Sequence, residues 1–206
     1  MDEAGVIIIL MPWRCFLAEP SDFCRKSLRR YAGAKRCPLK PLHYHNADGV
    51  IAPQFPADTA NEGGTFPGEH EGDPRWPALC KCGYTFLQED TWQVNVDRLF
   101  KGCPDGKLYI RRELLPGAMW VVDWLDSNIY KGPDGKAWSL MLPGGAEWLV
   151  YGPAGGGGKW DVQGVPPDIT VSPSINCEGV YHGFVKQGVV AEDCEGRTFP
   201  DGPRTA

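Results

Sequence analysis

The cysteine and histidine residues of the N-terminal half fall into two short groups that could bind one metal ion. Residues 80–83 read Cys-Lys-Cys-Gly, and Cys37 precedes a His-Tyr-His segment at 43–45. Thiolate and imidazole groups are the ligands of structural Zn²⁺ sites, which bring two such half-sites together around one tetrahedral ion. The spacing therefore predicts a zinc site with four protein ligands, namely Cys37, Cys80, Cys82 and either His43 or His45.

The turn around Cys80 and Cys82 has one feature that favours a zinc knuckle and one that departs from it. Gly83 follows the pair, and a knuckle often needs a backbone conformation that residues with a Cβ atom resist. The departure is the spacer, because the usual knuckle has two residues between its cysteines and this one has only Lys81. Four protein ligands would close the site, so we expect a structural ion rather than a catalytic one.

A second group of metal-binding residue types lies near the C-terminal end and consists of Cys177, His182 and Cys194. Three ligands make an incomplete structural site. The alternative is that the thiols pack inside the protein and that His182, within an expected strand at 180–185, forms hydrogen bonds. We favour this alternative.

Nucleophilic catalysis has little support in the sequence. A Cys177–His182 pair can be drawn, but no residue that would orient the histidine is evident. The serines near strand-like segments lack the strand–turn–helix elbow of serine hydrolases; they are Ser139, Ser172 and Ser174. We therefore expect no catalytic residues.

Composition and turn signals predict a protein built mainly from short strands. The 206 residues include 26 glycines, 19 prolines and eight tryptophans, which is typical of many turns and aromatic packing. Pro-Asp-Gly turns at 104–106 and 133–135 each precede an apolar segment. We expect an α+β, predominantly β fold, with a zinc-knuckle or treble-clef-like module at 1–95 and an antiparallel β-meander or sandwich at 96–206.

One short amphipathic helix is expected in the N-terminal module, over residues 22–32. Ser21 is a suitable N-cap, apolar residues recur at helical spacing up to Tyr31, and Gly33 can end the helix. The opposite face would carry basic residues that could contact nucleic acid; they are Arg25, Lys26, Arg29 and Arg30. The net charge of −5 disfavours nucleic acid as the partner of the whole chain.

Two further segments bear on organisation and location. Residues 48–75 are rich in Gly, Pro, Glu and Asp and predict a long loop, in which His70 is expected to face solvent. Val6–Leu10 is apolar but too short to cross a bilayer, and acidic residues precede it where a secretory signal carries positive charge. We interpret it as a first strand and expect a cytoplasmic protein, in which clustered cysteines bind metal rather than form disulfides.

Six segments spread over residues 20–190 carry a resemblance to a known family. They are Cys37 with Tyr44–Ala47, Trp76–Tyr84, Pro116–Trp120, Gly132–Gly135, Pro167–Ile175 and Tyr181–Phe184. These segments resemble small proteins of tailed bacteriophages. The resemblance implies a phage-encoded protein that acts in the cytoplasm of the host cell or is carried in the virion. It also favours His45 over His43 as the zinc ligand.

The last two of these segments also resemble a bacterial domain of unknown function, some members of which are encoded beside ubiquitin-like conjugation genes. In that domain a histidine like His182 is often followed by an Asp-Cys pair like Asp193-Cys194 and then by another histidine. Here Glu195-Gly196-Arg197 occupies that place, which disfavours a second metal site.

Phage proteins of this kind often carry the name ammonia monooxygenase. A membrane copper oxygenase needs transmembrane helices and a histidine-rich copper site, and the sequence shows neither pattern. We therefore expect no monooxygenase activity.

The sequence favours a zinc-stabilised phage accessory protein that binds another protein in the infected cell. Aromatic side chains displayed on a turn-rich β scaffold would serve as contact anchors. The alternatives are a nucleic-acid-binding zinc protein, a metal-dependent hydrolase that uses the C-terminal His/Cys group, and a minor virion component. No membrane association is expected.

Overall fold

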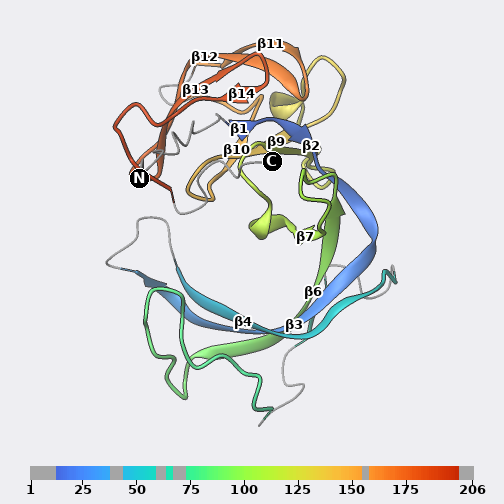
Figure 1. Cartoon of the computed structure of the whole chain (residues 1–206), viewed down its shortest axis with the longest axis vertical. Helices are drawn as coiled ribbons and strands as arrows, with labels where there is room; N and C mark the ends of the chain where they lie inside the picture. Colours follow the sequence, from blue (N-terminus) through green and yellow to red (C-terminus); the bar gives the residue numbers. More distant parts are fainter. Residues whose placement is uncertain (1–12, 38–43, 59–63, 67–72, 155–157, 200–206) are drawn as a thin grey trace, which may run out of the picture. The chain divides into compact units, whose positions relative to one another are not determined.

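The chain divides into two compact units, seen in Figure 1. The computed structural model describes residues 13–37, 44–58, 64–66, 73–154 and 158–199. One unit, here called the sandwich unit, comprises Met1–Ala18, Cys103–Asp105 and Leu115–Ala206. The other, the curved-sheet unit, comprises Glu19–Gly102 and Gly106–Leu114. The chain therefore passes between the two units four times, whereas the sequence analysis expected one boundary, between residues 95 and 96.

The sandwich unit contains two β-sheets. The strand order is β1-β14-β13-β12-β11 in one sheet and β10-β9-β8-β2 in the other, and every pair is antiparallel except the parallel pair of β2 and β8. The bounds are β1 Trp13–Arg14, β2 Phe16–Leu17, β8 Ala118–Val121, β9 Trp138–Met141, β10 Glu147–Leu149, β11 Asp161–Val165, β12 Asp168–Cys177, β13 Tyr181–Lys186 and β14 Val189–Val190, with a 3-10 turn, η2, at Asn128–Tyr130.

The core of this unit lies between the two sheets. Alternate residues of β12 and β13, such as Ile175 and Tyr181, are buried together with Met119 and Leu140 from the other sheet. Alternation with a period of two is what a strand with one buried face requires. The expectation of antiparallel β structure in the C-terminal half is confirmed, and it takes the form of a sandwich.

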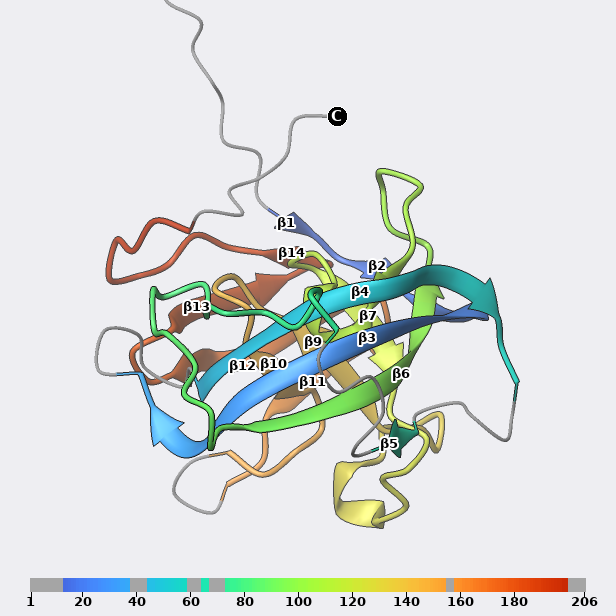
Figure 2. The same cartoon turned by 90° about the horizontal axis from the view of Figure 1, so that it is seen from below.

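The curved-sheet unit is built on long strands that run side by side (Figures 1 and 2). Its sheet has the order β4-β3-β6-β5, and β7 pairs with β6. The bounds are β3 Glu19–Arg36, β4 Tyr44–Pro56, β5 Thr65–Phe66, β6 Thr91–Lys101 and β7 Tyr109–Ile110, followed by a 3-10 turn, η1, at Arg111–Glu113.

The prediction of a helix at residues 22–32 is wrong, because these residues form the middle of β3. Among the described residues no α-helix occurs, and the fold is β rather than α+β. Strand β3 has a hydrogen-bonded partner on each side, β4 and β6, so its backbone groups are satisfied in extended form. Leu28 is buried on one face, whereas its neighbour Arg29 reaches a carboxylate on the other. Tertiary pairing thus overrides a local pattern that also fits a helix.

The loop expected at 48–75 is also shorter than predicted. Strand β4 continues through Pro56, and β5 adds a short strand at Thr65–Phe66. Three other expectations concern parts of the chain outside the described residues: the first strand at Val6–Leu10, the alternative ligand His43 and the exposed His70.

Arginines of β3 form salt bridges within the curved-sheet unit. Arg25 pairs with Glu113 at 2.6 Å, and Arg29 pairs with Asp48 at 2.9 Å. Arg112 of η1 also contacts Asp48, at 2.5 Å. Burial alone would raise the pKa of Asp48, but the hydrogen bonds and charges of Arg29 and Arg112 outweigh it and hold that pKa below its usual value.

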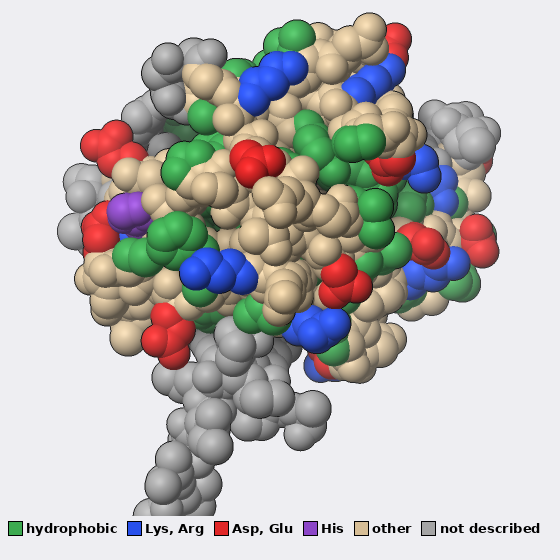
Figure 3. Space-filling view, turned by 90° about the horizontal axis from the view of Figure 1, so that it is seen from above, with side chains coloured by type: hydrophobic (Ala, Val, Ile, Leu, Met, Phe, Trp, Pro, Cys, Tyr) green, Lys and Arg blue, Asp and Glu red, His purple; other side chains and the backbone are tan. Residues whose placement is uncertain are grey.

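These salt bridges bear on the basic surface expected for nucleic acid. Arg25 and Arg29 are neutralised by carboxylates, and Arg30 donates to the Leu87 carbonyl at 2.6 Å with its guanidinium over the Phe86 ring. Figure 3 shows another face, on the side of β11–β14, where basic and acidic side chains are interspersed rather than gathered by sign. Phosphate binding needs uncompensated positive charge. Because Arg25 and Arg29 are paired with carboxylates, the structure does not favour phosphate binding through these arginines.

Candidate metal centre

The first half-site is assembled by the pairing of β3 with β4. Arg36, the last residue of β3, pairs with Tyr44, the first residue of β4. Cys37 comes directly after Arg36, and His45 comes directly after Tyr44. The antiparallel register of β3 and β4 therefore brings Cys37 and His45 to the same end of the sheet. Both residues are buried, at 7% and 5% exposure. The sequence predicted this association only through residue type, because the strands themselves were not expected.

The second half-site is a tight turn at residues 80–83. The Cys80 N–H donates to the Tyr84 carbonyl and the Gly83 N–H donates to the Cys80 carbonyl, both at 2.9 Å, and Leu79 and Thr85 form a β-bridge below the turn. Gly83 has a φ of +90°, in the region that favours glycine. The backbone conformation expected of this glycine is confirmed, whereas the zinc knuckle stays a prediction.

The two half-sites meet through Cys37, His45 and Cys82. Their ligand atoms all lie within 4.8 Å of one another, and His45 Nδ1 lies 3.2 Å from Cys82 Sγ. Around a tetrahedral Zn²⁺ the distance between a ligating nitrogen and a sulfur would be about 3.6 Å, and that between two sulfurs about 3.8 Å. The group could therefore hold a metal ion once its more widely spaced ligand atoms, up to 4.8 Å apart, move closer together.

The orientation of the His45 ring is fixed by groups that the sequence analysis did not identify. The ring stacks on Tyr84 with centroids 4.1 Å apart and planes 11° apart. The Tyr84 hydroxyl donates to Asp90 Oδ2 at 3.1 Å, and the buried carboxylate of Asp90 also accepts from the Leu87 N–H at 2.7 Å. Such supporting contacts hold a ligand in place around a metal. Tyr84 directly follows the Cys-Lys-Cys-Gly turn, which was the available signal.

Cys80, the fourth predicted ligand, is not part of the group of three. It is buried at 3% exposure and packs with Ala32 and Phe86. Cys80 and Cys82 are separated only by Lys81, and Cys82 packs against the same cluster, but only Cys82 belongs to the group of three. The single-residue spacer is the physical difference from the usual knuckle.

The C-terminal group of Cys177, His182 and Cys194 is not assembled as a metal site; within the described ranges the only such group is the one around His45. Cys177 pairs with Tyr181 across the ladder and packs toward the core, and burial raises the pKa of its thiol. His182 is the next residue after Tyr181, so it points to the other face of the sheet. Alternation along β13 thus separates two of the three candidate ligands.

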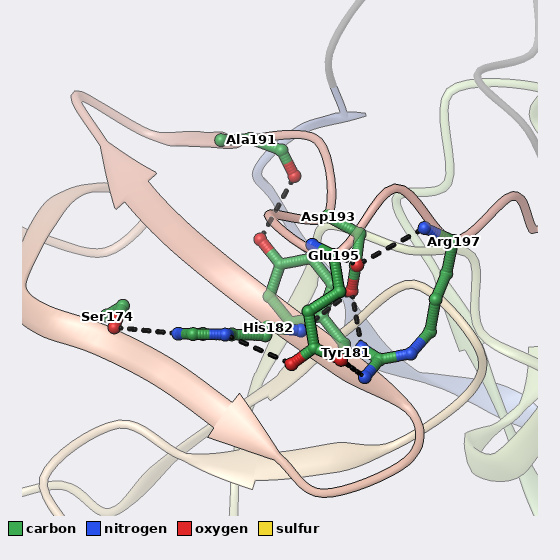
Figure 4. Close-up of polar contacts among 7 residues, drawn as sticks. All are labelled: Ser174, Tyr181, His182, Ala191, Asp193, Glu195 and Arg197. Atoms are coloured by element: carbon green, nitrogen blue, oxygen red, sulfur yellow. Dashed lines mark hydrogen bonds and ion pairs between the residues drawn. The ribbon is translucent and has the colours of Figure 1, made fainter.

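His182 instead takes part in a chain of polar contacts, drawn in Figure 4. Its Nε2 lies 3.1 Å from Ser174 Oγ, and its Nδ1 lies 3.2 Å from Glu195 Oε1. The expected hydrogen-bonded strand histidine is confirmed. The sequence analysis paired His182 with Cys177 and found no residue that would orient the histidine. In the structure the partner of His182 Nε2 is the Ser174 hydroxyl, and Glu195 contacts Nδ1.

Asp193 organises the segment that carries Glu195. Its carboxylate, which has no exposed side-chain surface, accepts from the backbone N–H groups of His182 and Glu195, each at 2.8 Å, and pairs with Arg197. Burial alone would raise the pKa of Asp193, but these N–H donors and the Arg197 guanidinium lower it below its usual value.

Cys15 and Cys103 behave as packed thiols. Burial raises the pKa of Cys15 to about 12 and that of Cys103 to about 11, so both stay protonated near neutral pH and are poor ligands and nucleophiles.

Comparisons with protein-family models, curated proteins and solved structures gave no match. No helix within the described ranges is both long and apolar enough to span a membrane. The functional interpretation therefore depends on the ligand atoms of the centre and on their surroundings.

Proposed function

We propose that the protein is a zinc-stabilised binding protein, in which one structural Zn²⁺ joins the β3–β4 end to the turn at 80–83. The observation that carries the proposal is the meeting of two thiols and one imidazole, buried or half-buried, from two distant parts of the chain. Soft sulfur ligands combined with imidazole select Zn²⁺ over Mg²⁺ or Ca²⁺, which prefer oxygen. A site shielded from solvent on most sides suits a structural ion.

A closed zinc site needs a fourth ligand, and we assign it to Cys80. Its sulfur lies on the same turn as Cys82, and the positive φ of Gly83 gives this turn a shape that knuckles use. A change in the side-chain rotamer of Cys80, exchanging its contact with Phe86 for the ion, would complete the set. The ion would supply stability to a segment whose own buried cluster around Cys80 is small.

Protein binding is the role that we assign to the segment held by the ion. Leu79 and Leu87 flank the turn and are exposed at 57% and 45%, and Tyr44 beside His45 is exposed at 41%. Large apolar side chains at the surface of a rigid element make contact anchors for an apolar protein surface. With the resemblance to phage proteins, the partner would be a host or phage protein in the infected cell or a component of the virion.

The zinc proposal is tested by metal analysis of the purified chain. We expect one zinc per chain, loss of binding in Cys82→Ser, and, with Co²⁺ in place of zinc, a tetrahedral spectrum whose thiolate charge-transfer band weakens by a third in Cys80→Ser. Cys194→Ser, which changes an exposed thiol of the other unit, is the matched control and should bind as the wild type does. A wild-type chain without bound metal, or a Cys82→Ser variant with full binding, contradicts the proposal.

The binding role is tested separately with variants that keep the metal. Leu79→Asp and Leu87→Asp should abolish capture of the partner from infected-cell lysate while retaining one zinc per chain. Val165→Asp, at a side chain exposed at 73% in the sandwich unit, is the matched control for added surface charge. Equal capture by Leu79→Asp and by the wild type would remove this surface from the proposal without affecting the zinc site.

A further inference from the structure

We propose that Ser174, His182 and Glu195 form a nucleophilic site that transfers acyl groups from carboxylic esters. The three side chains form a continuous chain of contacts, with Ser174 Oγ 3.1 Å from His182 Nε2 and His182 Nδ1 3.2 Å from Glu195 Oε1 (Figure 4). This is the order of groups that activates a serine hydroxyl in hydrolases of unrelated folds. All three residues belong to the sandwich unit, so the proposal does not depend on the metal centre.

An irregularity in β12 places the serine beside the histidine. Val171 pairs with Val185 and Ile175 pairs with Gly183, so residues 172–174 lie opposite Phe184 alone. Bulges of this kind redirect side chains and are common next to active sites. Ile175 is buried in the core, so Ser174 points to the opposite face of the sheet, the same face that carries His182.

The partners of the imidazole determine where its proton lies. A glutamate carboxylate only accepts hydrogen bonds, so the Nδ1 atom that contacts Glu195 must carry the proton. In the neutral ring Nε2 is then an acceptor, and the Ser174 hydroxyl must donate to it. This is the tautomer that a general base needs for removing a proton from serine.

Glu195 is itself held in place by charged and backbone groups. Its second carboxylate oxygen contacts the Arg197 guanidinium, and its backbone N–H donates to the buried carboxylate of Asp193 at 2.8 Å. The same Asp193 carboxylate accepts from the His182 backbone N–H at 2.8 Å. The buried carboxylate of Asp193 therefore holds both the base, His182, and Glu195. Glu195 acts through His182 rather than on the ester, so it is a positioning residue.

The reaction uses only the ester and water. Ser174 Oγ attacks the carbonyl carbon while its proton passes to His182 Nε2, and the alcohol leaves with that proton, which gives an acyl-serine. Water then attacks the acyl carbon, His182 takes its proton, and the carboxylic acid leaves as the serine is restored. Asn176 pairs with His182 in the ladder and is exposed on the same face, so its amide can donate to the carbonyl oxygen as negative charge develops there.

The surroundings of His182 indicate a substrate whose ester group is accessible from solvent. The His182 side chain is 30% exposed, so the base can be reached from solvent. Phe184, half-buried opposite the bulge, offers an apolar contact for the acyl group, and Lys186 lies over its ring at 5.0 Å. We infer a preference for aliphatic acyl groups that carry a negative charge near the ester.

A fluorophosphonate probe, which modifies activated serines, tests the proposal on the full-length chain. We expect covalent labelling located at Ser174 by mass spectrometry, no labelling in Ser174→Ala, and a loss of about 10²-fold in labelling rate in His182→Gln. Ser172→Ala removes a neighbouring hydroxyl in the same bulge and should label at the wild-type rate. Absence of labelling in the wild type, or equal labelling of Ser174→Ala, would overturn the proposal.

Imidazole nitrogen shifts measured by NMR test the positioning role of Glu195 independently of reactivity. In the wild type at alkaline pH we expect the His182 tautomer with its proton on Nδ1. In Glu195→Ala we expect a shift to the Nε2–H tautomer, and a fall of labelling of at least about tenfold. Glu192→Ala, which changes an acidic residue of the same segment, should keep the wild-type tautomer. An unchanged tautomer in Glu195→Ala would contradict the assigned role.

Discussion

The sandwich unit and the curved-sheet unit are both β structures that bury apolar side chains, but they differ in what their other groups do. In the sandwich unit, apolar side chains of two sheets, such as Leu140 and Tyr181, pack against each other. In the curved-sheet unit, β3 carries salt bridges on one face, including Arg29 with Asp48, and leads to the thiol and imidazole group at one end. Both units therefore have an apolar core, and the curved-sheet unit adds the charge pairs of β3 and a candidate metal site.

The two units also differ in where their candidate sites lie: the candidate metal site lies at the ends of strands, and the Ser174–His182 pair lies on a sheet face. The candidate metal group forms where the ends of strands and a turn meet, because thiols from separate segments can converge there. The Ser174–His182 pair lies on the outer face of a sheet whose inner face is fully packed. A rigid apolar core holds the strand residues of that pair in register, whereas the metal ligands would themselves hold their segments together.

The largest effect that would sharpen this comparison is removal of the metal. In the zinc-loaded chain, chelation should destabilise the region around His45 and residues 73–90 by about 5 kcal/mol or more, since ion binding and local folding are coupled there. Hydrogen exchange followed by mass spectrometry should show loss of protection in those segments and unchanged protection in β12 and β13. An equal loss of protection in both units would show that the metal does not stabilise the curved-sheet unit more than the sandwich unit.

A truncation in the sandwich core should give the opposite pattern. Leu140 has no exposed surface, and Leu140→Ala should cost about 3 kcal/mol of unfolding free energy through lost burial and the cavity left behind. Urea denaturation with and without chelator would measure it. We expect the same cost in both conditions, and a cost that vanishes after chelation would contradict the independence of the two cores.

The sequence predicted the β-rich class and the three residues of the candidate metal site because both depend on residue type. Turn residues and the soft ligands Cys37, His45 and Cys82 carry that information locally. The helix expected at 22–32 failed because β3 is specified by its partners β4 and β6, which are distant in sequence. Local periodicity cannot show that Arg29 will meet Asp48 across the sheet.

Two groupings of residues show what spacing alone leaves open. Cys80 lies outside the group of three, and the spacing of a tight turn does not show in which direction each side chain points. The grouping of Cys177 with His182, disfavoured from the sequence, is opposed by strand alternation, because Cys177 lies on the face of Tyr181, which precedes His182. The contact of His182 with Ser174 depends on the register irregularity of β12, which leaves no recognisable pattern in the sequence.

A smaller effect is expected at the salt bridges of the curved sheet. Asp48→Asn leaves Arg29 and Arg112 without their shared carboxylate, and we expect a loss of about 2 kcal/mol at pH 7. Because the pKa of Asp48 in the folded chain lies below 3.8, its contribution is complete above that pH and disappears as the pH falls through the lowered pKa. Urea denaturation at pH 7 and pH 3 should show the wild type approaching the variant in acid.

Asp126→Asn is the matched control for that change. Asp126 also pairs with a cation, Lys131, at 2.6 Å and has a lowered pKa caused by that hydrogen bond, but its side chain is 94% exposed in the sandwich unit. Water screens such a pair, so stability should not change measurably. An effect of Asp126→Asn equal to that of Asp48→Asn would mean that burial in the curved sheet is not the reason for the difference.

The smallest effect concerns a pair of glycines, one in each unit. Gly83 has a φ of +90° and Gly135 a φ of +75°, and a Cβ atom added to either would meet no atom within 4 Å. Replacement by alanine should therefore cost only the strain of the left-handed backbone, about 1 kcal/mol in each case. Gly83→Ala should in addition weaken zinc binding by several-fold in a chelator competition, because the strain falls on the turn that carries Cys82. Gly135→Ala should leave zinc affinity unchanged, and an equal loss of affinity in both variants would show that the ion does not depend on the shape of the 80–83 turn.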